Sequence, residues 1–170
     1  LDSAPTFSKV WTALAQGQSV EGTPDPGTAK PFLIAALHMR LNVPTVVLVP
    51  RPEDAQQLYV QLQLWLGEDF PVHLYPESDA LPYERLTAEP STSHQRINAL
   101  AALLGVSSKE GRGKPLIVAS ALAASRKTLS SSTFATCTIN LSKGSMSPIE
   151  QVVEKALWAG YRAEPGVEVP

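Results

Sequence analysis

Apolar residues recur at helical spacing in several stretches of the chain, and these stretches predict its helices. Between Pro52 and Pro71 the apolar positions lie three and four residues apart, which is the period of one helix face. They are Ala55, Leu58, Tyr59, Leu62, Trp65 and Leu66. Further helices are predicted over residues 6–16, 31–41, 91–105 and 147–160. The stretch 31–41 is apolar on nearly all sides, which favours a helix packed inside an α/β layer.

Capping signals define the ends of two of these helices. Thr92 and Gln95 have the spacing of a capping box at the start of the fourth helix. In the last one, Ser147 is the expected N-cap, Pro148 the first helical residue and Gly160 the terminator. These signals predict helices whose first and last residues are specified locally.

Short apolar runs rich in β-branched residues lie between the helices and predict strands. They span Thr45 to Val49, Val72 to Tyr75 and Leu116 to Ala119. Runs of this kind, separated by helices, are typical of strands buried on both faces of a parallel sheet. The sequence therefore predicts an α/β fold, a parallel sheet with flanking helices.

The pattern changes near residue 130. Ser130 to Thr133 is a polar link, and Phe134 to Leu141 alternates loosely, as a strand containing Cys137 would. We therefore expect one domain over residues 1–129 and the incomplete beginning of a smaller α+β domain over residues 130–170.

Composition narrows the classes of function. The formal net charge is −2, and phosphate-dominated binding to nucleic acid needs a surplus of Lys and Arg, so direct DNA binding is disfavoured. The single cysteine cannot form an intrachain disulfide, which fits a reducing compartment. No apolar run approaches the ~20 residues needed to cross a bilayer. We expect a cytoplasmic protein.

A glycine-containing turn over residues 20–32 resembles a damaged phosphate-binding loop between a first strand and a first helix. A working loop uses backbone N–H groups, a Lys for the phosphates and an adjacent Ser or Thr for Mg²⁺. Gly27 and Lys30 are present, but Ala29 stands where such loops have Gly, and Pro31 has neither a hydroxyl nor an N–H. Pro24 and Pro26 also lack amide donors. We expect a degenerate phosphate loop that binds no cofactor.

A second part of a nucleotide site is also missing. A nucleotide-binding fold of this type places a carboxylate after a core strand to hold the metal, but Ser120 to Ala124 contains none. His38, His73 and His94 have no metal-ligand spacing, so neither a metal site nor a catalytic group is predicted. The alternative is an ATP-dependent enzyme whose loop still holds phosphate.

The segment Glu77-Ser78-Asp79-Ala80-Leu81-Pro82-Tyr83-Glu84-Arg85-Leu86, followed by the helix from Ser93 to Leu100, resembles bacterial transcription-repair coupling factors. The resemblance continues in order to residues 44–50, to residues 116–120 and to Gly160-Tyr161. It implies a RecA-like domain similar to the first domain of the repair protein UvrB, with a second, smaller domain inserted. UvrB itself has an intact Gly-Lys-Thr loop and a long Tyr-rich hairpin, for which the segment between Tyr75 and Thr92 is too short.

The resemblance also implies a role. In these proteins the UvrB-like module recruits UvrA for nucleotide excision repair, and RNA polymerase, DNA and ATP are engaged by other parts of the protein. The chain would then be a non-catalytic scaffold. Contacts with UvrA come from basic residues after the Gly-Tyr pair, which in this chain points to Arg162.

Overall fold

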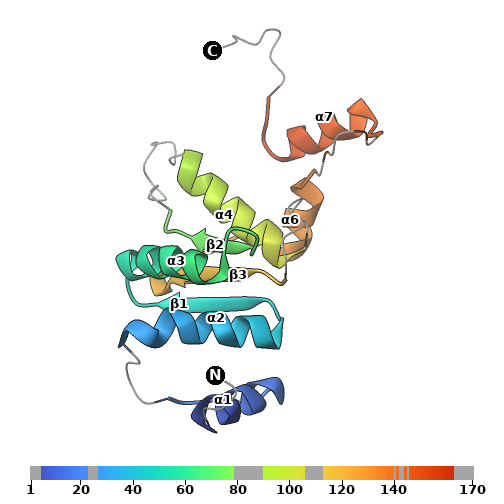
Figure 1. Cartoon of the computed structure of the whole chain (residues 1–170). Helices are drawn as coiled ribbons and strands as arrows, with labels where there is room; N and C mark the ends of the chain where they lie inside the picture. Colours follow the sequence, from blue (N-terminus) through green and yellow to red (C-terminus); the bar gives the residue numbers. More distant parts are fainter. Residues whose placement is uncertain are drawn as a thin grey trace.

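The computed structural model describes residues 5–22, 27–78, 90–105, 113–139, 141, 144 and 146–162. Its elements follow in the order α1 (Pro5–Ala15), η1 (Gly27–Ala29), α2 (Lys30–Leu41), β1 (Thr45–Val49), α3 (Pro52–Leu66), β2 (Val72–Tyr75), α4 (Pro90–Leu103), β3 (Leu116–Ser120), α5 (Ala121–Ser125), α6 (Ser131–Cys137) and α7 (Ile149–Trp158). Figure 1 shows the three strands side by side at the centre of the molecule, with helices around them.

The three strands form one parallel sheet in the order β1-β3-β2. Val118 of β3 is in register with Val47 on one side and with Leu74 on the other. β3 is buried along its whole length because it has a strand on each side and helices above and below. The predicted α/β class and parallel strands are confirmed, and the architecture is consistent with a RecA-like fold.

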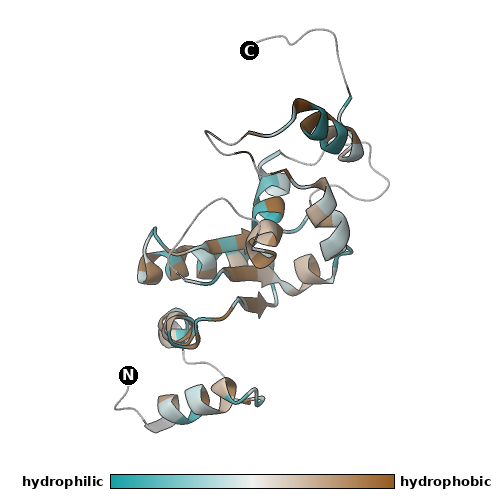
Figure 2. Ribbon diagram, turned by 90° about the vertical axis from the view of Figure 1, so that its right-hand side faces the viewer, coloured by the Kyte–Doolittle hydropathy of each residue, from teal (hydrophilic) through white to brown (hydrophobic). Residues whose placement is uncertain are grey.

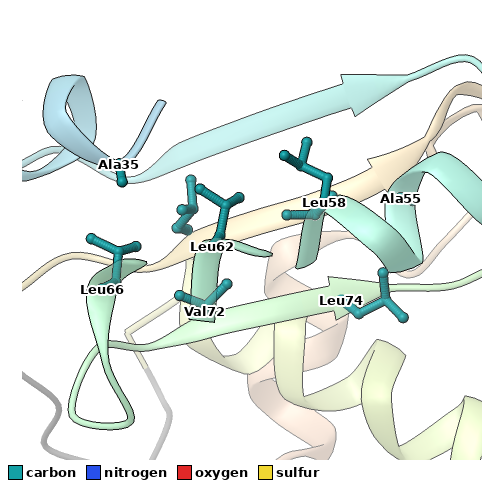
Figure 3. Close-up of a cluster of buried hydrophobic side chains, with 9 residues drawn as sticks. Ala35, Ala55, Leu58, Leu62, Leu66, Val72 and Leu74 are labelled. Carbon is teal, nitrogen blue, oxygen red and sulfur yellow. The ribbon is translucent and has the colours of Figure 1, made fainter. Parts of the chain in front are cut away.

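One face of the sheet is covered by α3. Its residues Ala55, Leu58, Leu62 and Leu66 point toward Val72 and Leu74 of β2 and toward alternate residues of β3 (Figure 3). Leu62 is fully buried, at 0% exposure. Because side chains alternate between the faces of a strand, Leu116 and Val118 join this cluster, whereas Ile117 and Ala119 face the other way.

The opposite face is covered by α4 and α5. Ala99 of α4 and Ala123 of α5 pack against Tyr75 of β2 and against Ile117 and Ala119 of β3. Small residues on both helices let them approach the sheet closely. The sheet is therefore the middle of three layers, with α3 on one face and α4 and α5 on the other.

The expectation that every strand is buried on both faces is wrong for β1. Val46 and Leu48 are 52% and 57% exposed, while Val47 and Val49 pack against the α3 cluster. α4 packs on β2, at the other edge of the sheet. α5 contacts β1 on the α4 side of the sheet, but in the described part of the chain Val46 and Leu48 stay exposed there.

α2 is also less enclosed than its sequence predicts. Only Pro31, Ala35 and His38 are buried, and Met39 is 56% exposed. α2 packs on α3 with one side, and α1 lies against it on another, where the Arg40 guanidinium sits 4.3 Å from the centre of the Trp11 ring. Ala35 joins the core cluster under α3, with Ile34 packed against it, while other residues of α2 serve contacts with the two helices.

The predicted strand over residues 134–141 is wrong, because residues 131–137 form α6. Ser130 caps this helix by accepting a hydrogen bond from the Thr133 amide at 3.2 Å, and Phe134 is buried. A local cap and one buried aromatic side chain outweigh the loose alternation that indicated a strand. Cys137 therefore ends a helix, and the described residues after 130 contain α6 and α7 but no strand.

The expected helix starts shift by one or two residues. α4 begins at Pro90, so Thr92 lies inside its first turn and is not the N-cap. α7 begins at Ile149 with Pro148 as its N-cap residue, so the predicted cap at Ser147 is wrong. Its end is as predicted: Gly160 has φ 92°, and the Tyr161 amide donates to the Ala156 carbonyl at 3.0 Å.

α7 stands away from the sheet and packs on α6 (Figure 1; Figure 2). The Lys155 ammonium donates to the Thr138 carbonyl at 3.2 Å. In the described residues, no helix is long and apolar enough to span a bilayer.

Candidate functional site

The loop with the phosphate-binding resemblance leads directly into α2. Gly27 has φ 55°, a left-handed conformation that glycine adopts without strain. It opens the short helix η1, and α2 follows at Lys30 with Pro31 in its first turn. Pro31 is buried, so its ring contributes to packing while the position supplies no amide to the loop.

The element before this loop is the predicted helix, α1, and not the strand that a phosphate loop follows. A phosphate loop joins a buried strand to a helix, so that its amides are presented at the end of a sheet. Here α1 precedes the loop, and residues 18–22 are exposed and form no strand. Among the described residues, no strand therefore precedes this loop. Pro24 and Pro26 lie outside the described residues.

A cleft of about 430 Å³ lies at the carboxyl end of β1, between the start of α2 and the outer side of α3. Lys30 and Pro31 line it from α2, and Asp54, Gln57 and Gln61 line it from α3. The structure thus places Gly27, Lys30 and Pro31 at one cleft, as their sequence proximity suggested. Ala29 is not among its lining residues.

Charged side chains of both signs line this cleft. Lys30 brings one cation, but Asp54 brings a carboxylate, which repels phosphate oxygens. Asp54 also accepts hydrogen bonds from the Arg51 Nε at 3.1 Å and Nη2 at 3.3 Å, and this pair raises the pKa of Arg51. The two glutamines add neutral donors and acceptors. The cleft therefore combines one cation and one carboxylate with an apolar lining from Pro31, Val49, Pro50 and Leu58.

Ser120, the last residue of β3, caps a helix and contacts a carboxylate. Ser120 is 1% exposed, and its hydroxyl accepts a hydrogen bond from the Ala123 amide at 3.1 Å, which caps α5. The same hydroxyl donates to Glu77 Oε1 at 2.7 Å. The position where a nucleotide-binding relative would carry a metal-binding carboxylate is thus occupied by a helix cap.

Sequence reasoning missed that Glu77 reaches this point. It found no carboxylate after β3, but Glu77 follows β2, and parallel strands end at the same edge of a sheet. This shared edge of parallel strands is the signal in the sequence from which the position of Glu77 could have been predicted. Glu77 and Ser120 line a second cleft of about 300 Å³ with Gln56, Tyr75 and Thr92. The two clefts share no lining residue, so Glu77 and Lys30 are not brought into one site.

Arg96 anchors α4 at the edge of this second cleft. Its Nη2 donates to the Tyr75 hydroxyl at 2.6 Å, its Nη1 donates to the Pro76 carbonyl, and its Cζ lies 4.1 Å from the centre of the Tyr75 ring. These contacts hold the chain at the beginning of the distinctive 77–86 segment. Residues 79–86 of that segment, including Tyr83, lie outside the described residues.

Arg162 lies elsewhere. It is exposed and follows the Gly160-Tyr161 pair at the end of α7, and it lines neither cleft. Among the described residues, no cluster of His, Cys, Asp and Glu could hold a metal ion. His38 is buried, with hydrogen bonds to Thr45 and to the Lys114 carbonyl, and so has a structural position.

Comparison with known proteins finds one kind of similarity. The chain is 26% identical over 167 residues to a transcription-repair-coupling factor from Myxococcus xanthus, a match that covers 95% of the chain. The chain spans only 14% of the length of that relative. No protein-family model matches the chain, and no solved structure matches it.

Proposed function

We propose that this chain is the UvrB-like part of a transcription-repair coupling factor and acts as a non-catalytic scaffold that recruits UvrA during nucleotide excision repair. The observation that carries the proposal is the similarity along 95% of the chain to a coupling factor. The segment 77–86 and the α/β sheet support it. In this proposal the ATP-driven motor and the contacts with RNA polymerase and DNA belong to other parts of a longer protein.

The proposed absence of catalysis rests on the chemistry of the cleft at Lys30. Pro31 has no N–H and no hydroxyl, Asp54 faces the same space, and Ser120 caps a helix where a metal-binding carboxylate would be needed. A triphosphate with Mg²⁺ would therefore lack the amide and the hydroxyl of the residue after Lys30, and the carboxylate that holds the metal. We propose that the loop is degenerate and that the domain serves as a folded support.

Calorimetric titration with ATP and Mg²⁺ tests this point. We expect no saturable heat from the chain, and the same result for Lys30→Ala. Saturation at micromolar nucleotide that Lys30→Ala abolishes would instead support the alternative, an ATP-dependent UvrB-like or helicase-like domain. That alternative is favoured by one observation, the presence of Lys30 at a cleft beside the start of α2.

UvrA recruitment is tested with the full-length protein, because the relative is much longer than this chain. Purified UvrA is titrated against the wild type and against Arg162→Glu, with Lys127→Glu as a matched charge reversal at another exposed residue. Loss of an exposed charged contact should weaken binding about tenfold for Arg162→Glu and little for Lys127→Glu. Absence of saturable binding by the wild type would contradict the proposed role.

A further inference from the structure

β1 lies at one edge of the sheet, with β3 on one side and no described strand on the other (Figure 1). The Thr45 amide donates toward β3, to the Pro115 carbonyl at 2.9 Å. Because the amides of successive strand residues point to opposite sides of the strand, the N–H and C=O groups of Val46 and Leu48 point away from β3. Within the described residues these groups have no hydrogen-bond partner.

β1 also lacks the features with which proteins protect a free strand edge. Edge strands ordinarily carry a charge, a proline or a bulge that hinders pairing with a further strand. Thr45–Val49 contains no charged residue and no proline, and it pairs with β3 in continuous register without a bulge. The edge therefore suits an added strand, because only a strand pairs a row of backbone groups.

The other edge strand is better covered. Val72, Leu74 and Tyr75 of β2 are each at most 8% exposed, since α3 lies over one face and α4 over the other. β1 has α3 on one face, but Val46 and Leu48 are 52% and 57% exposed on the opposite face. Of the two edges in the described fold, β1 is therefore the one that is open both at its side and on one face.

The existing connections between strands indicate where a further helix would lie. α3 joins β1 to β2 over one face of the sheet, and α4 joins β2 to β3 over the opposite face. Connections between parallel strands are almost always right-handed. A right-handed connection from β3 past β1 runs in the same direction as the one from β2 to β3, so it crosses the α4 face. Val46 and Leu48 are exposed on that face.

α5 already starts along this course. It begins directly after β3, lies on the α4 face and contacts β1. The segment before α2 is a poorer candidate for the missing strand, because residues 18–22 are exposed and form no strand. In addition, α2 packs on the α3 face through Ala35 and so does not cover Val46 and Leu48.

We infer that a later segment of the same polypeptide adds a strand parallel to β1 at its outer edge, and that the connection to this strand covers Val46 and Leu48. The inference rests on the proposed function, in which this chain is part of a longer protein, as it is 14% of the relative's length. Because a strand inside a parallel sheet is buried on both faces, the added strand is apolar and rich in β-branched residues.

A second copy of the chain fits this edge less well. Two copies related by a twofold axis would pair their β1 edges antiparallel. That arrangement brings no helix onto the α4 face of either β1, so Val46 and Leu48 of both copies stay exposed. A downstream strand with its connecting segment satisfies both the backbone groups and the apolar side chains.

Hydrogen exchange of the full-length protein, read at single amides by mass spectrometry with peptide fragmentation, tests the inference. We expect the Val46 and Leu48 amides to exchange at least about a hundredfold more slowly than in an unstructured chain. The Val47 amide, which points toward β3, is the internal reference for a paired strand. Protection should be the same from about 1 to about 50 µM protein, because the added strand belongs to the same molecule.

Photo-cross-linking identifies the added strand. With p-benzoylphenylalanine in place of Leu48, we expect cross-links to residues after Pro170 in the same polypeptide. The same group in place of Leu64, exposed on α3, is the matched control and should not capture that segment. Exchange uses the wild type, so it remains decisive if the Leu48 variant folds poorly.

Four results would overturn the inference. They are unprotected Val46 and Leu48 amides, protection that grows with protein concentration, protection that requires added UvrA, and cross-links from position 48 to residues before α2. The main exchange measurement contains no UvrA and no ATP, so its failure is distinguishable from failure of the proposed function.

Discussion

The hydroxyl of Ser120 donates to Glu77 Oε1 at 2.7 Å, and this bond joins the ends of β3 and β2. Ser120 also caps α5, so one buried hydroxyl connects two strands and a helix. The two partners are far apart in sequence and meet because the strands are parallel.

Replacing Ser120 with Ala should therefore cost more than the loss of a helix cap. A cap alone contributes about 1 kcal/mol, and leaving a half-buried carboxylate without its donor adds about 1 kcal/mol. Urea unfolding measures the difference. Ser130→Ala is the matched control, because Ser130 caps α6 and is exposed. Equal losses for the two variants would mean that the bond to Glu77 contributes nothing.

Stability should fall in mild acid because of His38. Burial lowers the pKa of His38 from its ordinary value of 6.5, against a smaller opposing effect from the Lys114 carbonyl. Since the unfolded chain binds the proton more readily, this contribution to stability is complete above pH 6.5 and is lost as the pH falls through the lower folded pKa.

The hydrogen bonds around His38 fit both charge states. The Lys114 carbonyl can only accept, so Nε2 carries the proton in the neutral ring and Nδ1 accepts from the Thr45 hydroxyl, 2.8 Å away. In the charged ring Nδ1 donates to Thr45, whose hydroxyl can turn to the Val43 carbonyl at 3.0 Å. The cost of protonation is thus desolvation. Thermal unfolding from pH 7.5 to 5 gives the dependence of Tm on pH. This dependence should become flatter in His38→Gln and should keep the wild-type slope in His94→Gln, because His94 is exposed.

Leu62 should be among the most sensitive core positions. It is 0% exposed under α3, and Leu62→Ala leaves a cavity that costs about 3 kcal/mol. Leu64→Ala, two residues along the same helix and 80% exposed, should change the free energy of unfolding by less than about 0.5 kcal/mol. Chemical denaturation of both variants checks the burial pattern, and similar losses would contradict the orientation of α3.

Arg96→Lys should loosen α4 despite keeping the charge. Lysine cannot contact the Tyr75 hydroxyl, the Pro76 carbonyl and the Tyr75 ring together, whereas the planar guanidinium does. We expect a loss of about 1–2 kcal/mol and faster amide hydrogen exchange in α4. Arg126→Lys is the control, because Arg126 follows α5 and makes none of these three contacts with Tyr75 and Pro76. Unchanged exchange in α4 would mean that Arg96 does not anchor the helix.

Several features of the fold follow from local sequence alone. The period of apolar residues identifies α3 and the β-branched runs identify the three strands, because each signal depends on residues a few positions apart. Pro31 removes an amide and a hydroxyl from the loop by its covalent structure. The order of the motifs resembles that of transcription-repair coupling factors. The match to one of them over 95% of the chain supports this resemblance.

Other features depend on neighbours that are distant in sequence. The burial of Phe134, together with the exposed cap at Ser130, favours a helix over residues 131–137. The open face of β1 is set by where α4 packs, and the apolar run from Thr45 to Val49 contains no sign of it. Glu77 reaches Ser120 only because two parallel strands end together.

By itself, the sequence determined the order and type of most elements and the chemistry that the Gly27 to Pro31 loop lacks. Only the tertiary structure decided which faces are covered, which carboxylate meets β3, and that Lys30 and Glu77 belong to different clefts. The physical reason is that helix period and proline chemistry act over a few bonds, whereas burial and hydrogen bonding between elements depend on how the whole chain packs.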